Sequence, residues 1–325
     1  MRKAHHVLRL ESMDWLNTRY FLQDLEDEIH LLLCNNRNGD DGEYLGFDFD
    51  RDSIEEVESA IQSVPNVLSR KEDSSGLYPI QMQVSLFPTE GYRVSASAVP
   101  FVSLLARLGI TFGQFEVEER GGLLIEDGFG HNVLQRLVMS SKGMDGDRSH
   151  HDLADRRCVV VLKELKDTGS FTREDVRNFA LLSVLCSQSV FAIRRFKFLI
   201  ELNPDELGRA DRNGCLPLHY TAVHSSILGF RLVLDAGLRC FPERKGINLL
   251  FRKNRNDATP FMLACARHGR ERVMEIIDII LVKRSDKYNT AEALVLAVID
   301  ERIDLDCVYF LLRREPDMLQ KLLSG

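Results

Sequence analysis

The chain has 325 residues, of which 44% are hydrophobic and 28% charged, and its formal net charge is −7. This composition excludes a disordered protein, because enough apolar side chains are present to fill a large core. The acidic excess lies in residues 1–75, which hold 17 acidic against 8 basic residues, and the small basic groups elsewhere do not form the stripe of a nucleic-acid-binding protein.

The chain carries no pattern of a secreted or membrane protein. Its basic start, residues 1–10, is not followed by an apolar run of signal-peptide length, and its longest uncharged stretch, residues 178–193, is too short and polar to span a bilayer. The 7 cysteines form no Cys-x-x-Cys pair, which indicates buried thiols in a reducing compartment. We therefore expect a soluble, cytoplasmic protein, with the nucleus as the alternative location, and no membrane or nucleic-acid partner.

Residues 12–34 include an amphipathic run and then an apolar run, Ile29–Leu33, and a helix is expected over residues 54–61. Before that helix, Asp48, Asp50 and Asp52 alternate as in a calcium loop, which would continue with Gly and Glu where Ser53 and Ser59 stand. We interpret these acids as the start of the helix, where negative charge is favourable. Residues 1–64 as a whole predict an atypical acidic cap on the repeat array that follows.

The next segments predict short helices and turns. A helix is expected from Pro79 and another over Ala98–Gly109, and two short β-hairpins are expected, from Ile110–Phe112 with Leu123–Ile125 and from Gly237–Pro242 with Gly246–Phe251. Gly128–Val133 begins like a dinucleotide fingerprint but lacks the third glycine and the strand-helix-strand context. We interpret it as a turn between repeats.

Residues 139–157 are rich in Ser, Gly and Asp and predict an exposed insert. His150, His151, Asp152 and Asp155 are residue types that bind metals, yet adjacent histidines rarely point at one ion, so we predict no metal site. Helices are then expected around residues 176–186 and 191–202. No P-loop string and no nucleophile context occurs, so we predict no cofactor and no enzymatic activity.

The strongest pattern is a phrase that occurs twice. Leu216–Ala222 recurs 43 residues later as Thr259–Cys265, and in both copies a proline stands at the first position of an expected helix. Each helix is followed by a turn and a second apolar-periodic helix. Similar offsets, close to about 42 residues, predict an all-α array over residues 65–325 with units that start near residues 79, 133, 176, 217, 260 and 290.

These residues resemble the ankyrin repeat. Asp211–His219 carries the pattern Asp-x-x-Gly-x-x-Pro-Leu-His, and Asn256–Pro260 is a second version in which Asp257 replaces the turn glycine and Met262 the motif histidine. The match covers residues 207–281 well and 65–206 loosely. The period departs from the ankyrin value of 33 and is closer to HEAT and armadillo arrays, so the resemblance is to a divergent long-period ankyrin type.

The resemblance implies a solenoid of helix pairs with β-hairpin fingers, used for protein–protein recognition, in which His219 is structural. We therefore expect a monomeric, non-enzymatic scaffold that binds an unidentified protein partner. The alternative is a structural spacer, or an autoinhibited array whose acidic N-terminal segment docks on the basic later repeats. The candidate partner-binding residues, at finger tips and helix ends, are Arg212, Asn213, Arg255, Asn256, Asp257, His224, Arg267 and His268.

Overall fold

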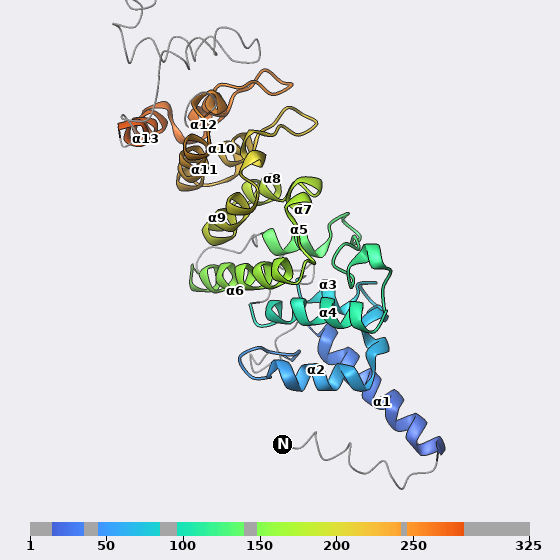
Figure 1. Cartoon of the computed structure of the whole chain (residues 1–325). Coiled ribbons are helices and arrows are strands. Elements are labelled where there is room, and N and C mark those ends of the chain that lie inside the picture. The colour runs from blue at the N-terminus through green and yellow to red at the C-terminus, as the bar shows by residue number, and fades with distance from the viewer. Residues whose placement is uncertain (1–14, 36–44, 85–95, 140–147, 242–245, 283–325) are drawn as a thin grey trace, which may run out of the picture. The chain divides into compact units, whose positions relative to one another are not determined.

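The computed structural model describes residues 15–35, 45–84, 96–139, 148–241 and 246–282. The described residues divide into two compact units, one within Met1–Leu137 and Gly143–Phe171 and the other within Val138–Lys142 and Thr172–Gly325. Within these ranges every regular element is an α-helix or a short 3₁₀ helix (Figure 1). The all-α prediction is therefore confirmed.

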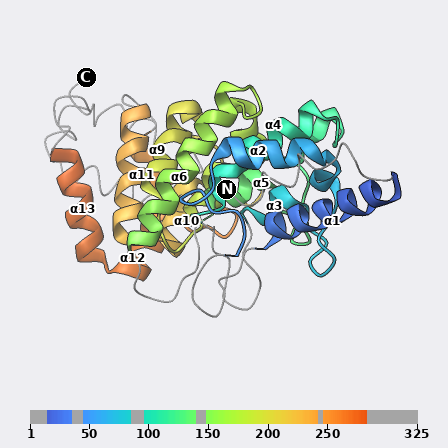
Figure 2. The same cartoon turned by 90° about the horizontal axis from the view of Figure 1, so that it is seen from below.

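The first unit packs its helices around one core. α3 and the 3₁₀ helix η2 lie on α1, α4 and η2 lie on α2, and α6 lies on α4 and η3 (Figure 2). Ile61, Phe101, Leu105 and Leu162 are at most 1% exposed and fill the space between these elements. The bounds are α1 (Trp15–Cys34), α2 (Ile54–Ser63), η2 (Pro65–Ser69), α3 (Pro79–Met82), η3 (Val99–Phe101), α4 (Val102–Thr111), η4 (Val117–Glu119), α5 (Val133–Val138, ending at the boundary between the units) and α6 (Arg148–Asp167).

The second unit repeats one packing step along the chain. α8 contacts α10, α10 contacts α12, and α11 and α13 pack behind α10 and α12. Phe196, Phe230, Phe251 and Val273 are at most 2% exposed in this core. The bounds are α7 (Arg173–Asn178), α8 (Leu181–Cys186), α9 (Ile193–Leu202), η5 (Pro204–Gly208), α10 (Pro217–His224), α11 (Ile227–Cys240), η6 (Ile247–Leu250), α12 (Pro260–His268) and α13 (Arg270–Val282).

Helices begin where the repeat pattern predicts them. Pro79, Pro217 and Pro260 each occupy the first turn of a helix, where the missing amide costs no helical hydrogen bond. Thr259 caps α12, because its hydroxyl accepts a hydrogen bond of 3.1 Å from the Met262 amide. α5 begins at the predicted position, Val133, and α7 begins at Arg173, three residues before the predicted start at residue 176. The unit predicted near residue 290 lies outside the described residues.

Helix ends also recur, and a proline causes them. The residue before a proline is disfavoured in the helical region, because the ring clashes with its backbone. Val64 (φ −145°, ψ 67°) precedes Pro65 and Asn203 (φ −146°, ψ 83°) precedes Pro204, and both end a ten-residue helix with nearly the same backbone angles. A 3₁₀ helix follows in each case.

The predicted β-hairpins are wrong as far as they fall on described residues. Ile110 and Thr111 continue α4, whose last turn is closed by the Phe112 amide on the Leu108 carbonyl at 2.9 Å. α11 continues through Gly237 to Cys240, and Leu249 and Leu250 lie in η6. Leu249, Leu250 and Phe251 are buried, whereas Ile110 is 52% exposed on α4. The helical context of these segments therefore overrides the strand preference of their β-branched and aromatic residues.

The predicted exposed insert at residues 139–157 is wrong from residue 148 onward. α6 runs from Arg148 to Asp167, and its buried face holds Ala154, Cys158, Val161, Leu162 and Leu165 at helical spacing. His150, His151 and Asp152 form the first turns of this helix and not a loop. The polar start of the helix concealed its apolar periodicity, which begins only at Ala154.

Candidate functional site

The loop before α10 is organised by Asp211. Its Oδ1 accepts hydrogen bonds of 2.8 Å from the amides of both Asn213 and Cys215, and its Oδ2 accepts one of 2.6 Å from the Tyr220 hydroxyl. Burial alone would raise the pKa of this carboxyl, but these hydrogen bonds outweigh it and lower the pKa below its usual value. Gly214 closes the turn at φ +77°, a conformation that favours glycine. The Asp211 carboxylate is therefore used inside the loop.

The loop before α12 has the same conformation 43 residues later. Asn254 Oδ1 accepts from the Asn256 amide at 2.9 Å and from the Ala258 amide at 3.0 Å. Asp257 takes the place of Gly214 and has a φ of +56°, so the residue that replaces the turn glycine keeps its left-handed backbone. An uncharged amide thus organises this loop where a carboxylate organises the first.

A third copy lies in the first unit. Asp127 Oδ1 accepts from the amides of Phe129 (2.8 Å) and His131 (3.1 Å), and Gly130 has a φ of +73°. The interpretation of Gly128–Val133 as a turn is confirmed. Its similarity to Asp211–Cys215 can be seen in the sequence, because Asp127 and Gly130 have the same Asp-x-x-Gly spacing as Asp211 and Gly214.

Hydrogen bonds link the two loops of the second unit. The Arg255 amide donates to the Asn213 carbonyl at 2.9 Å, and the Asn254 side chain donates to Cys215 Sγ at 3.4 Å. Figure 1 shows the two loops, yellow and orange, projecting side by side before α10 and α12. The two loops therefore form one hydrogen-bonded frame that carries both loop tips.

His219 makes a further hydrogen-bonded link between the two loops. Its Nδ1 accepts a hydrogen bond of 2.9 Å from the Leu216 amide, so its Nε2 carries the proton and donates to the Ala258 carbonyl at 3.2 Å. Burial lowers the pKa of this imidazole to about 4, which keeps it neutral. The prediction that His219 is structural and ties its own loop is confirmed, and the bond to the second loop adds to it.

Five of the eight predicted site residues come together. Arg212, Asn213, Arg255, Asn256 and Asp257 are all exposed and lie on the two linked loops, and we call these five residues the loop-tip surface. The other three lie at the far ends of α10 and α12: His224 and Arg267 are exposed and His268 is half-buried. His224 stacks on Tyr220, with ring centroids 6.4 Å apart. The predicted residues thus form two groups at opposite helix ends.

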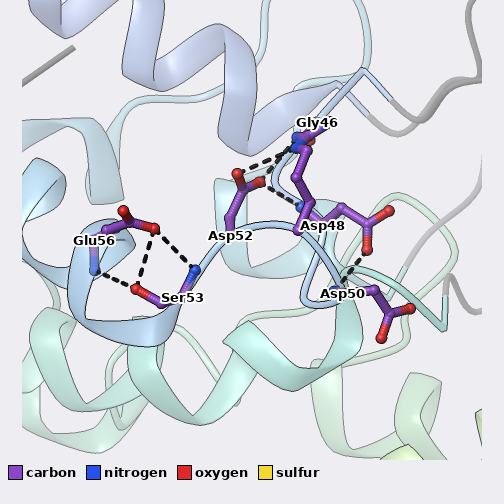
Figure 3. Close-up of polar contacts among 7 residues, drawn as sticks. Gly46, Asp48, Asp50, Asp52, Ser53 and Glu56 are labelled. Carbon is purple, nitrogen blue, oxygen red and sulfur yellow. Dashed lines mark hydrogen bonds and ion pairs between the residues drawn. The ribbon is translucent and has the colours of Figure 1, made fainter. Parts of the chain in front are cut away.

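Asp48–Asp52 form a turn that leads directly into α2, whose N-cap is Ser53. Asp52 Oδ2 accepts from the Asp48 amide at 2.9 Å, Asp48 Oδ1 accepts from the Asp50 amide at 3.0 Å, and Arg51 pairs with Asp52. Figure 3 shows the three carboxylates pointing apart instead of converging. Ser53 and Glu56 then form a reciprocal capping box on α2.

Within the described ranges, no group of three or more His, Cys, Asp or Glu side chains is arranged to hold a metal ion. No helix in the same part of the chain is both long and apolar enough to cross a membrane.

Comparison with known proteins gives no match either: no protein-family model and no curated protein matches this chain.

Proposed function

We propose that the chain is a divergent ankyrin-like array that acts as a non-enzymatic scaffold and binds a protein partner at the loop-tip surface. The observation that carries the proposal is the pair of identical turns linked by the 2.9 Å bond from the Arg255 amide to the Asn213 carbonyl. A surface that is ordered before binding loses less entropy on association than flexible loops would. Five exposed side chains on such a frame are suited to specific recognition.

The proposal also includes the cellular compartment in which the chain binds its partner. Cys34, Cys158 and Cys186 are buried, as thiols in a reducing compartment usually are. Cytoplasm or nucleus fits this pattern. We propose that the scaffold acts there as a monomer.

The test is capture of partners from cell lysate by the immobilised full-length chain, compared with an Arg212→Glu/Arg255→Glu variant. A matched control, Lys197→Glu/Arg231→Glu, makes the same charge change at exposed positions on α9 and α11. The proposal expects one partner to be retained by the control and lost by the tip variant, with circular dichroism showing that both are folded. A partner retained by all three proteins contradicts the loop-tip assignment.

The charge distribution favours a second candidate, an autoinhibited array. Residues 1–75 hold 17 acids against 8 bases, whereas residues 190–290 hold 18 bases against 11 acids, so the two segments attract each other. Capture of no partner by any of the three proteins at low salt, followed by capture at higher salt, favours this candidate, because salt weakens a docked acidic segment.

A further inference from the structure

The two loops that carry the loop-tip surface contain more basic than acidic residues. Residues 209–215 and 252–258 contain five basic and two acidic residues, and Asp211, one of the two acids, is engaged by Tyr220 and two backbone amides. Asp257 is the other acid. The basic residues are Arg209, Arg212, Arg252, Lys253 and Arg255.

Arg212 and Arg255 are the two guanidinium groups of this set that stand at the tips. Both are exposed, and neither makes an ion pair in the described part of the chain. Arg209, in contrast, pairs with Glu206 at 3.3 Å and donates to the Arg177 carbonyl. The tip arginines therefore keep their full capacity for carboxylate oxygens, which a guanidinium binds in a bidentate way.

The packing of α10 against α12 sets the distance between the charges of Arg212 and Arg255. The loops precede α10 and α12, which contact each other, and packed helices lie about 8–10 Å apart. An extended peptide rises about 3.3 Å per residue, so acidic residues roughly three positions apart match two adjacent tips.

From this charge and spacing we infer that the partner at the loop-tip surface presents an extended acidic segment whose carboxylates bind Arg212 and Arg255. The inference rests on the proposed function and adds the chemistry of the partner. Asp257 opposes such a segment, because its carboxylate is exposed two residues from Arg255. Replacing that charge should therefore strengthen binding.

The test measures fluorescence anisotropy of a labelled Gly-Ser peptide with glutamate at every third position, and of its glutamine counterpart, with the full-length chain at low and high salt. The glutamate peptide should bind about tenfold more tightly than the glutamine peptide at low salt, because each tip arginine attracts a carboxylate but not a neutral amide. The preference should shrink at high salt.

Variants then locate the binding. Arg212→Glu/Arg255→Glu should lower the affinity for the glutamate peptide by about tenfold or more, whereas Lys197→Glu/Arg231→Glu should lower it by less than about threefold. Asp257→Asn should raise it about twofold to threefold, because asparagine tolerates the left-handed backbone and removes the opposing charge.

Three results would overturn the inference: no preference for glutamate over glutamine, equal losses in the tip and control variants, or tighter binding of a single-stranded oligonucleotide of the same charge that the tip variant loses. Failure of the proposed function has a different signature, a captured protein that the native chain, the tip variant and the control variant all retain. A captured protein that is lost with the tip variant while the glutamate peptide shows no preference leaves the scaffold function intact and removes only the acidic partner.

Discussion

At position 219, two hydrogen bonds fix the protonation state of a buried ring. The Leu216 amide occupies Nδ1 as a donor, so a second proton on that nitrogen would place two donors against each other. Gln81 makes the equivalent pair of bonds at the start of α3: it accepts from the Tyr78 amide at 2.9 Å and donates to the Ile125 carbonyl at 3.1 Å. An amide side chain can therefore replace this imidazole in its structural role.

His219→Leu and His219→Gln separate the hydrogen bonds from the volume of the ring. Leucine leaves the Leu216 amide and the Ala258 carbonyl without their partner, so we expect a loss of about 2–3 kcal/mol in the free energy of unfolding, while glutamine should stay within about 1 kcal/mol of the native chain. Urea unfolding of the full-length proteins measures both. Equal losses in the two variants would show that shape, and not hydrogen bonding, matters here.

The same ring makes stability depend on pH. The pKa of His219 is about 4 in the folded chain against an ordinary value of 6.5, so the unfolded chain binds more protons between these values. The stabilisation is complete above pH 6.5 and is lost as the pH falls toward 4, by roughly 3 kcal/mol at most. Urea unfolding across this range should show a shallower decline for His219→Gln than for the native chain, and parallel curves would contradict the assignment.

At the scale of elements, the positions that could be predicted are those with a local cause. Pro217 and Pro260 indicate helix starts, Thr259 indicates an N-cap, and Pro204 ends α9 at the preceding residue. α6 was missed because its first turns are polar and its apolar residues contact partners distant in the chain. The loop-tip residues could be predicted from the repeat, but the backbone bond between Arg255 and Asn213 could not, because it depends on how two repeats stack.

The contact between α4 and the turn at residues 119–124 depends on one glycine. A Cβ at Gly121 would lie 2.1 Å from the Ala106 carbonyl oxygen, and the residue also has a φ of +68°. Gly113 has a similar φ of +60° with nothing within 4 Å of its Cβ position. Substitutions at Gly113 and Gly121 therefore separate the cost of backbone strain from the cost of steric overlap.

We expect Gly113→Ala to cost about 1 kcal/mol, the strain of a left-handed alanine. Gly121→Ala should cost about 3 kcal/mol or more, because the backbone of α4 must also move. Thermal and urea unfolding give both values. A cost for Gly121→Ala no larger than that for Gly113→Ala would mean that α4 can shift without losing its packing.

At the scale of the whole chain, each unit has a core of its own. Phe101 and Leu105 are buried in the first unit among residues of the same unit, as Phe230 and Phe251 are in the second. Parts of a chain that pack around separate cores can open with separate free energies. A substitution that damages one core should therefore lower stability mainly within its own unit.

Hydrogen exchange on the full-length chain tests this directly with two reciprocal variants. Gly121→Ala should lower the amide protection of α4 and α6 and leave α10 and α12 near their native values, whereas His219→Leu should lower α10 and α12 and spare α4 and α6. The two variants control for each other, because each should be silent where the other acts. Equal loss of protection throughout the chain in both variants would mean that the two cores unfold as one cooperative unit.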